Sequence, residues 1–198
     1  MTNQAGWKEG RPRQYDLQRT LGPQETFIGW ASAALDELRA RVYDQIEDLP
    51  HEALIFTPEG SSLSIAALVI HMAWGEAGWM SGLADLQIPE DLDAQLQPAG
   101  RALPAGERPP LPDRVPDLIA LCKRVAKEVT RPAMACIEDP DATNPDDPRD
   151  ATPRGVLMHL IWHWTYHSGQ VGLLRELWGS GYRWRFGSLH ASVDHPDP

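Results

Sequence analysis

Three histidines stand four residues apart in the segment HLIWHWTYHSGQ, which spans residues 159–170. They are His159, His163 and His167, and on an α-helix they lie within roughly 80° of one another, together with Gln170. Two imidazoles at this spacing bring their tips close enough to bind one metal ion. A polar stripe that only packs against the rest of the protein has the same spacing, so spacing alone leaves both interpretations open.

A further histidine, His71, lies in the middle of the most apolar segment of the chain, residues 63–83. The histidine row shares its helical face with apolar residues, so we expect it to point inward, with Trp164 and Ser168 pointing away from that face. A third imidazole from a facing helix would leave one coordination position open, as in catalytic zinc sites. A histidine that only hydrogen-bonds within a core is the alternative, and no cysteine or HExxH motif decides between them.

The elements that must position these histidines are helices. Apolar residues spaced three and four apart predict helices over residues 24–49, 63–83, 113–130 and 153–178. The expected caps are Ser61 or Ser62, Asp113 and Thr152. We expect Pro132 to kink or end the third helix. Prolines forbid a continuous helix over residues 84–112, so a long crossover loop with a short helical turn is predicted there, and no strand is predicted anywhere.

The whole chain of 198 residues is consistent with one bundle domain over residues 22–180, an N-terminal arm over 1–21 that we expect to be loosely attached, and a C-terminal tail over 181–198. Its net charge of −10 argues against nucleic acid and anionic membranes as partners. No apolar stretch reaches the roughly 18 residues of a membrane span, and the first residues contain no secretory signal pattern. We expect the two cysteines, Cys122 and Cys136, to be buried thiols of a cytoplasmic protein.

Two segments resemble signatures of the DinB/YfiT-like superfamily. In residues 68–80, His71 is followed at five and eight positions by Glu76 and Trp79. Residues 157–179 are similar to the last bundle helix of that superfamily. That helix has a His-x-x-x-His pair, one further residue, Gly-Gln, and then an apolar run that contains an arginine and ends at a glycine. Here the pair is His163 and His167, Gly169 and Gln170 follow, and the run ends at Gly179. The resemblance covers about residues 23–179. It implies an all-α four-helix bundle with up-down-down-up connectivity and a long crossover between helices two and three, which fits residues 84–112.

The resemblance also implies one divalent metal ion held by His71, His163 and His167. An all-imidazole ligand set suits zinc or nickel, while manganese and iron are compatible as well. We expect His159 to have a packing or outer-sphere role, and it is the one candidate general base. Glu76 lies about 140° round the helix from His71 and is not expected to be a ligand.

Other residues near the histidines have two interpretations each. Trp74 and Tyr166 are expected to line the mouth of a substrate pocket or to pack in the core, and Gln170 to hydrogen-bond a ligand or a neighbouring helix. We expect Gly169 to allow a close helix contact. We expect Arg175 and Glu176 to be surface or interface charges, and the acidic loop at residues 138–150 to be a solvated connection.

Relatives in the superfamily include metal-dependent thiol S-transferases that use bacillithiol or mycothiol, thiol-dependent isomerases, and proteins described as hydrolases. The resemblance therefore implies a metal-activated low-molecular-weight thiol or water that attacks a small electrophilic molecule. It also implies a homodimer. The alternatives are a non-catalytic, stress-associated homodimer that binds metal, and a histidine-bearing bundle without metal.

Overall fold

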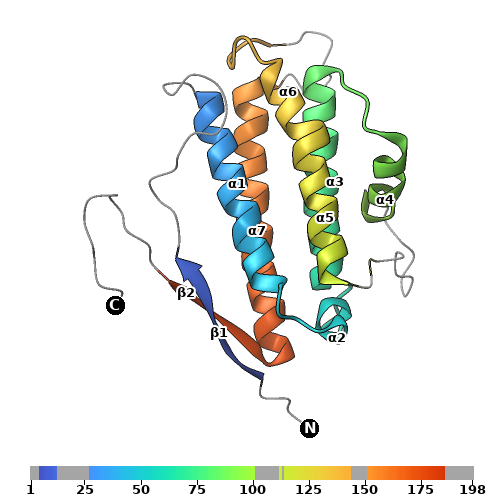
Figure 1. Ribbon diagram of the computed structural model, residues 1–198, viewed down its shortest axis with the longest axis vertical. Helices are drawn as coiled ribbons and strands as arrows, with labels where there is room; N and C mark the ends of the chain where they lie inside the picture. The colour runs from blue at the N-terminus through green and yellow to red at the C-terminus, as the bar shows by residue number, and fades with distance from the viewer. Residues whose placement is uncertain (1–4, 13–26, 101–111, 113, 144–150, 186–198) are drawn as a thin grey trace, which may run out of the picture.

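Four long helices form a bundle that spans the molecule (Figure 1). The computed structural model describes residues 5–12, 27–100, 112, 114–143 and 151–185. The long helices are α1 (Phe27–Ile46), α3 (Ile65–Ala84), α5 (Val115–Val125) and α7 (Pro153–Trp178). Helices α1 and α7 run in one direction and α3 and α5 in the other. The predicted all-α, up-down-down-up bundle is confirmed.

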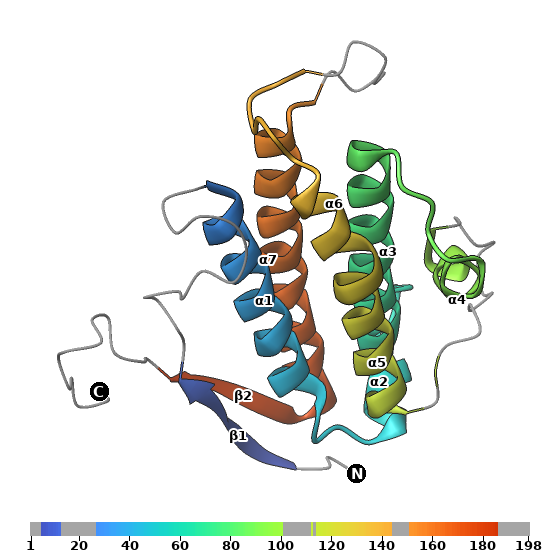
Figure 2. The same ribbon diagram turned by 45° about the horizontal axis from the view of Figure 1, so that its top comes forward.

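The connections before and after α3 contain helices of their own. A short helix, α2 (His51–Ile55), precedes α3, whose first turn is capped by Ser64 and not by Ser61 or Ser62. The Ser64 hydroxyl accepts a hydrogen bond from the Ala67 N–H at 3.3 Å. Because α3 and α5 are parallel, the chain must cross back along the bundle between them. That crossover contains α4 (Glu90–Gly100), which lies along the outer side of α3 (Figure 2) and is longer than the single turn predicted.

The third long helix continues past its proline. After α5 the chain widens into one π-helical turn, η1 (Ala126–Thr130), and then resumes as α6 (Arg131–Ala135). Pro132 has no N–H, and its ring would clash with the carbonyl of Glu128 four residues earlier. The wider turn, in which the Arg131 N–H bonds to the Ala126 carbonyl, is one way a helix accommodates such an interruption. The expected cap at Asp113 lies outside the described residues.

Helix α7 begins and ends where the sequence predicts. The Thr152 side chain accepts a hydrogen bond from the Gly155 N–H at 3.1 Å, and Pro153 follows it in the first turn. Gly179 ends the helix with a φ of 96°, in the left-handed region that residues with a Cβ disfavour. The three histidines of the row, His159, His163 and His167, therefore lie on one uninterrupted helix.

Replacing Gly179 by alanine should lower the free energy of unfolding by about 1 kcal/mol, because alanine is strained at this φ. Gly78 supplies a matched control, since it is exposed within α3 and a Cβ there meets nothing within 4 Å. Gly78→Ala should instead raise stability by about 0.5–1 kcal/mol. Urea titrations of both variants test the pair, and equal effects would contradict the role of φ.

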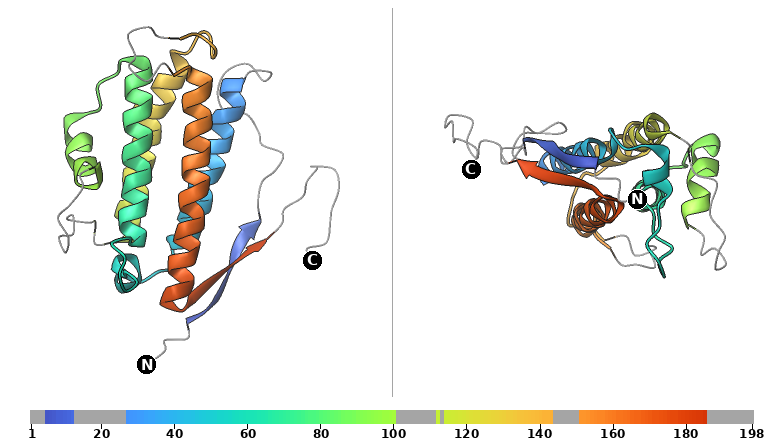
Figure 3. Two further views of the ribbon diagram at one scale, coloured as in Figure 1. Left: turned by 180° about the vertical axis from the view of Figure 1, so that it is seen from behind. Right: turned by 90° about the horizontal axis from the view of Figure 1, so that it is seen from below.

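A small parallel sheet joins the two ends of the chain at one end of the bundle (Figures 1 and 3). It consists of β1 (Ala5–Pro12) and β2 (Ser180–Arg185). Lys8 reaches Glu47 at 2.9 Å, and the Arg11 N–H donates to Asp44 at 2.8 Å. The expectations of no strand and of a loosely attached arm are therefore wrong for residues 5–12, because these contacts and the pairing with β2 hold them to α1. The domain limits at residues 21 and 180 stay predictions.

Arg175 anchors the sheet to α7, and the expectation of a surface or interface charge is wrong for this residue. Its side chain is fully buried, pairs with Asp48 at 2.6 and 2.7 Å, and donates to the Ser180 carbonyl at 2.9 Å. The cysteines also differ from each other: Cys122 is buried as expected, whereas Cys136 is exposed. None of the helices in the described part of the chain combines the length and apolar character that a bilayer span requires.

Candidate metal centre

Three imidazoles meet where α3 and α7 run side by side, as the left view of Figure 3 shows for the two helices. His71 comes from α3, and His163 and His167 come from α7. One nitrogen of each ring lies within 4.8 Å of the others. The Nε2 atoms of His71 and His163 are 3.2 Å apart. The structure thus brings together the three residues that the sequence singles out as ligands.

The spacing of these nitrogens fits a metal ion. Two imidazole nitrogens bound tetrahedrally at about 2.0–2.1 Å from zinc lie roughly 3.3–3.4 Å apart, close to the separation of the His71 and His163 nitrogens. The rings are half-buried, so one side of the cluster remains reachable from solvent. Among the described residues, no Cys, Asp or Glu joins the three histidines. The donor set is therefore three imidazoles with room for a further ligand.

Gln170 orients His167. The Gln170 carbonyl oxygen lies 2.6 Å from His167 Nδ1, and because an amide oxygen only accepts, Nδ1 must donate. This leaves the lone pair on Nε2, the tautomer that a metal-binding imidazole needs. The Gln170 amide nitrogen in turn donates to the Tyr166 hydroxyl at 3.3 Å. Gln170 and Tyr166 therefore support a histidine of the cluster, which is one of the two alternatives predicted for Gln170.

His163 is oriented by packing. Its Nδ1 is buried and has no hydrogen-bond partner among the described residues. Its ring lies against Gly75 of α3, where a Cβ would stand 3.0 Å from the ring carbon Cε1. The close helix contact thus occurs at Gly75 and not at Gly169, where a Cβ would meet nothing within 4 Å.

Burial disfavours the protonated form of two of the three imidazoles, because it lowers their pKa values. It lowers the pKa of His163 to about 4, and the neighbouring rings of His167, His71 and His159 act in the same direction. Burial, together with His167, also lowers the pKa of His71. A neutral ring keeps the lone pair that a cation requires, so the cluster is ready to bind a metal at neutral pH.

The metal-free protein should lose stability as the pH falls from about 6.5 to about 4. In this window the unfolded chain binds a proton at His163 that the folded chain resists, because the folded pKa is the lower one. The stability that the neutral His163 contributes to the folded protein is complete above about pH 6.5 and is lost below about pH 4. Urea titrations of metal-free wild type and His163→Ala across this range test it. The variant should show a shallower pH dependence, and identical slopes would contradict the assignment.

The remaining predicted site residues surround the cluster. His159 is exposed and stacks on His163 at a ring distance of 5.8 Å, while Trp79 packs on its other side at 4.8 Å. Trp74 stacks on His71 at 6.0 Å and is half-buried, and Tyr166 contacts His167 at 5.1 Å. Their roles toward a substrate stay predictions.

The histidine row does not point into the core as predicted. Trp164 and Ser168 occupy the fully buried side of α7, and the histidines lie at its seam with α3. This helix has apolar residues on all sides, so the spacing of its apolar residues does not identify one inward face. The prediction that the histidine face points inward is therefore wrong.

A buried charged network beside the cluster was not predicted. Glu76 of α3 is 1% exposed and accepts hydrogen bonds from Arg39 of α1 at 3.1 Å and from the Trp164 indole of α7 at 2.8 Å. The Thr130 hydroxyl, at the end of the π turn, donates to the same carboxylate. Glu76 therefore fixes α3 against three other elements, within two turns of His71. Its carboxylate is not part of the group of three histidines.

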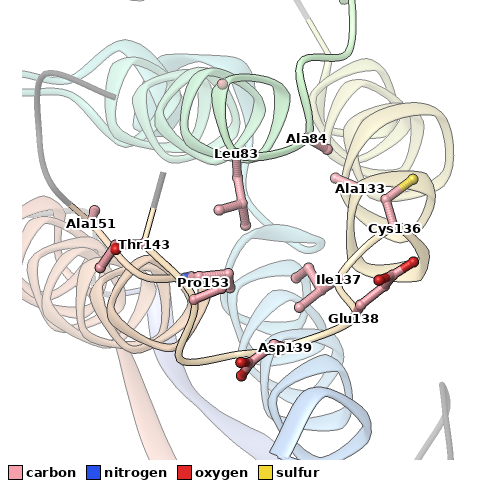
Figure 4. A pocket seen from close by; sticks show the side chains of 12 residues that line it. Leu83, Ala84, Ala133, Cys136, Ile137, Glu138, Asp139, Thr143, Ala151 and Pro153 are labelled. Carbon is pink, nitrogen blue, oxygen red and sulfur yellow. The ribbon is translucent and has the colours of Figure 1, made fainter. Parts of the chain in front are cut away.

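A separate cavity of about 340 Å³ opens at the end of the bundle where α3 ends and α7 begins (Figure 4). Leu83, Ile137 and Pro153 contribute apolar surface to it, and Glu138 and Asp139 contribute carboxylates. None of the clustered histidines lines this cavity. It is distinct from the pocket predicted around Trp74, Tyr166 and Gln170.

Comparison with known proteins places the chain in a family. The family model of mycothiol S-transferases matches residues 31–179, about three quarters of the sequence. The chain belongs to the mycothiol S-transferase family. This family is part of the DinB/YfiT-like superfamily, so the resemblance read from the histidine motifs is confirmed.

A solved structure is similar to this mycothiol S-transferase family member in fold. It is described as the crystal structure of a conserved protein of Enterococcus faecalis, and it superposes with a TM-score of 0.59 at 17% identity. The match covers 77% of this chain and 96% of the other. At this identity it shows the shared bundle only. A comparison with curated proteins finds no significant match.

Proposed function

We propose that the protein is a metal-dependent thiol S-transferase whose divalent metal is held by His71, His163 and His167. The observation that carries this proposal is the approach of three imidazoles, each through one ring nitrogen, to within 4.8 Å on a half-buried seam, in a chain of the mycothiol S-transferase family. A divalent cation bound there would lower the pKa of a coordinated thiol toward neutrality and so supply a nucleophile at pH 7. The all-imidazole set favours zinc or nickel over manganese or iron.

The chain's own residues then have three tasks. The three neutral ligands leave the full charge of the cation available, because they contribute none of their own. Gln170 holds His167 in the tautomer that presents Nε2. His159, exposed and stacked on His163, is the candidate to accept the proton of the thiol, and Trp74 and Tyr166 are candidates to border the substrates.

The substrates we propose are a low-molecular-weight thiol such as mycothiol and a small electrophilic molecule. We place the protein in the cytoplasm, because low-molecular-weight thiols are kept reduced in that compartment. The homodimer implied by the family resemblance is part of the same proposal. The non-catalytic alternative requires a closed site with a fourth protein ligand. His159 is not in the group of three, and no described carboxylate joins it, which supports the catalytic alternative.

The first experiment is elemental analysis of untagged protein followed by a transfer assay. The zinc- and nickel-loaded forms are incubated with mycothiol and an activated aryl halide, and thioether formation is followed by mass spectrometry. We expect near-stoichiometric metal and metal-dependent thioether. Metal without thioether, but with hydrolysis of ester substrates, would favour a hydrolase. Absence of bound metal after loading would overturn the proposal.

Gln170→Ala should weaken metal affinity by roughly 10–100-fold, because loss of a partner that orients a ligand has this effect at other metal sites. Gln170→Glu keeps an oxygen that accepts from His167 Nδ1 and should retain most of the affinity. Competition titration against a chelator measures both. Gln95→Ala, an exposed change on α4, is the control. Equal affinities of Gln170→Ala and this control would contradict the supporting role.

A further inference from the structure

The outer side of α7 carries a row of large apolar side chains. Trp162, Tyr166, Leu173 and Leu177 are 70%, 65%, 56% and 55% exposed. With Gly169 between them they form the α7 ridge, whose members are four, three, four and four residues apart. The first four follow the alternating spacing of a coiled-coil seam, in which one helix packs along another. A solvent-facing side of a bundle helix is normally polar, so this side is unusual.

No member of the α7 ridge carries a formal charge, and of the two charged residues just before its end at Leu177, Arg175 is buried and Glu176 is exposed. Residues 155–174 contain no Asp, Glu, Lys or Arg, although the chain carries a net charge of −10. Two copies of an acidic protein repel each other over most of their surfaces. They can approach where the acidic side chains are missing and apolar ones are exposed.

We infer that a second copy of this chain packs on the α7 ridge, with the two α7 helices antiparallel and the two-fold axis close to Gly169. In a symmetric pair each residue meets the residue at the same distance on the other side of the axis. Trp162 lies seven residues before Gly169 and Leu177 eight residues after it. Tyr166 and Leu173 lie three before and four after. The ridge is therefore complementary to itself in the antiparallel orientation.

The area is sufficient for a specific dimer. Given the surface that aromatic side chains carry, the four large side chains expose on the order of 500 Å² in each copy. A symmetric pair would bury about 1,000 Å² through them alone, which reaches the lower limit of specific interfaces. Polar residues flanking the ridge, such as Thr165 and Glu176, add to this area.

Gly169 lies where the two helices would come closest together. Packed helices lie about 8–10 Å apart, and Cα atoms stand about 2.3 Å from each axis, so two facing Cα atoms come within roughly 3–5 Å. Nothing in the described part of the chain lies within 4 Å of the position of a Cβ at Gly169. The ridge also borders the metal centre, because Tyr166 accepts a hydrogen bond from Gln170, which orients His167.

Sedimentation equilibrium on metal-free and zinc-loaded protein tests the interface, and its readout of mass does not depend on the proposed chemistry. We expect a dimer at micromolar concentration in both forms. Trp162→Glu and Leu173→Glu should each weaken association roughly 100-fold or more, because each places a carboxylate in the buried seam. Trp30→Glu is the control: Trp30 is 44% exposed but lies on α1. A monomeric wild type, or a dimer unaffected by both ridge variants, would overturn the inference.

Cross-linking locates the axis. In a Cys136→Ser background, which removes the exposed native thiol, Gly169→Cys should form a disulfide-linked dimer under mild oxidation. Glu176→Cys is equally exposed on α7 but should not, because its two copies would lie about 21 Å apart along the antiparallel pair. Cross-linking of Glu176→Cys in preference to Gly169→Cys would overturn the proposed axis.

Discussion

His163→Ala is expected to abolish stoichiometric binding of a divalent metal, and thiol transfer with it. The His163 ring lies close to both other rings of the cluster, with its Nε2 3.2 Å from His71 Nε2 and its centroid 4.6 Å from that of His167. Its removal leaves two imidazoles, one on each helix. The affinity should fall by more than the roughly 10–100-fold that loss of an orienting partner causes. Elemental analysis after gel filtration and calorimetric titration with zinc measure the loss.

His159→Ala is the matched control for this variant. The two residues are one turn apart on α7 and their rings stack, but only His163 belongs to the group of three. His159→Ala should keep one metal per chain and, if His159 accepts the thiol proton, lose activity mainly in kcat. Metal bound equally by both variants would contradict the ligand assignment. Loss of metal from both would show that His159 is part of the first coordination sphere.

Local geometry explains why the site could be predicted from sequence. Two histidines four residues apart must share a helical face, whatever the helix packs against. The cap at Thr152 and the end at Gly179 depend likewise on a few adjacent residues, and the structure has both where they were predicted. His71, which lies 92 residues from His163 in sequence, was a candidate because it stands in the middle of the most apolar segment, and the resemblance to the DinB/YfiT-like superfamily assigned it to the same metal.

What the sequence did not reveal depends on how the helices are rotated against one another. The sequence shows Glu76 only as an acidic residue in an apolar helix. Its buried partners are Arg39, Thr130 and Trp164, which come from α1, η1 and α7, and their positions follow only from the packing of these elements. The buried side of α7 could not be chosen because its outer side is apolar as well. The parallel pairing of β1 with β2 joins segments that are far apart in the chain. The β1 sequence has no alternating apolar pattern, and β2 alternates only over the four residues 182–185, which is too short to predict a strand on its own.

Replacing Arg39 by methionine should lower the free energy of unfolding by about 3–5 kcal/mol, the second large effect we expect. The Arg39 side chain is 5% exposed and forms two hydrogen bonds with the buried Glu76 carboxylate. Without it, a carboxylate remains in the core, and the donors left to it among the described residues are the Thr130 hydroxyl and the Trp164 indole. Breaking a buried ion pair from one side leaves an uncompensated charge, which is the reason for the size of the loss.

A second change distinguishes the lost ion pair from lost packing. In the double variant Arg39→Met, Glu76→Gln the side chain at position 76 is neutral but still accepts from the Trp164 indole, so much of the stability should return. Arg154→Met, which removes an exposed pair with Asp141, should have little effect on urea unfolding. If the double variant were no more stable than Arg39→Met alone, the stems of the two side chains would matter more than their charges.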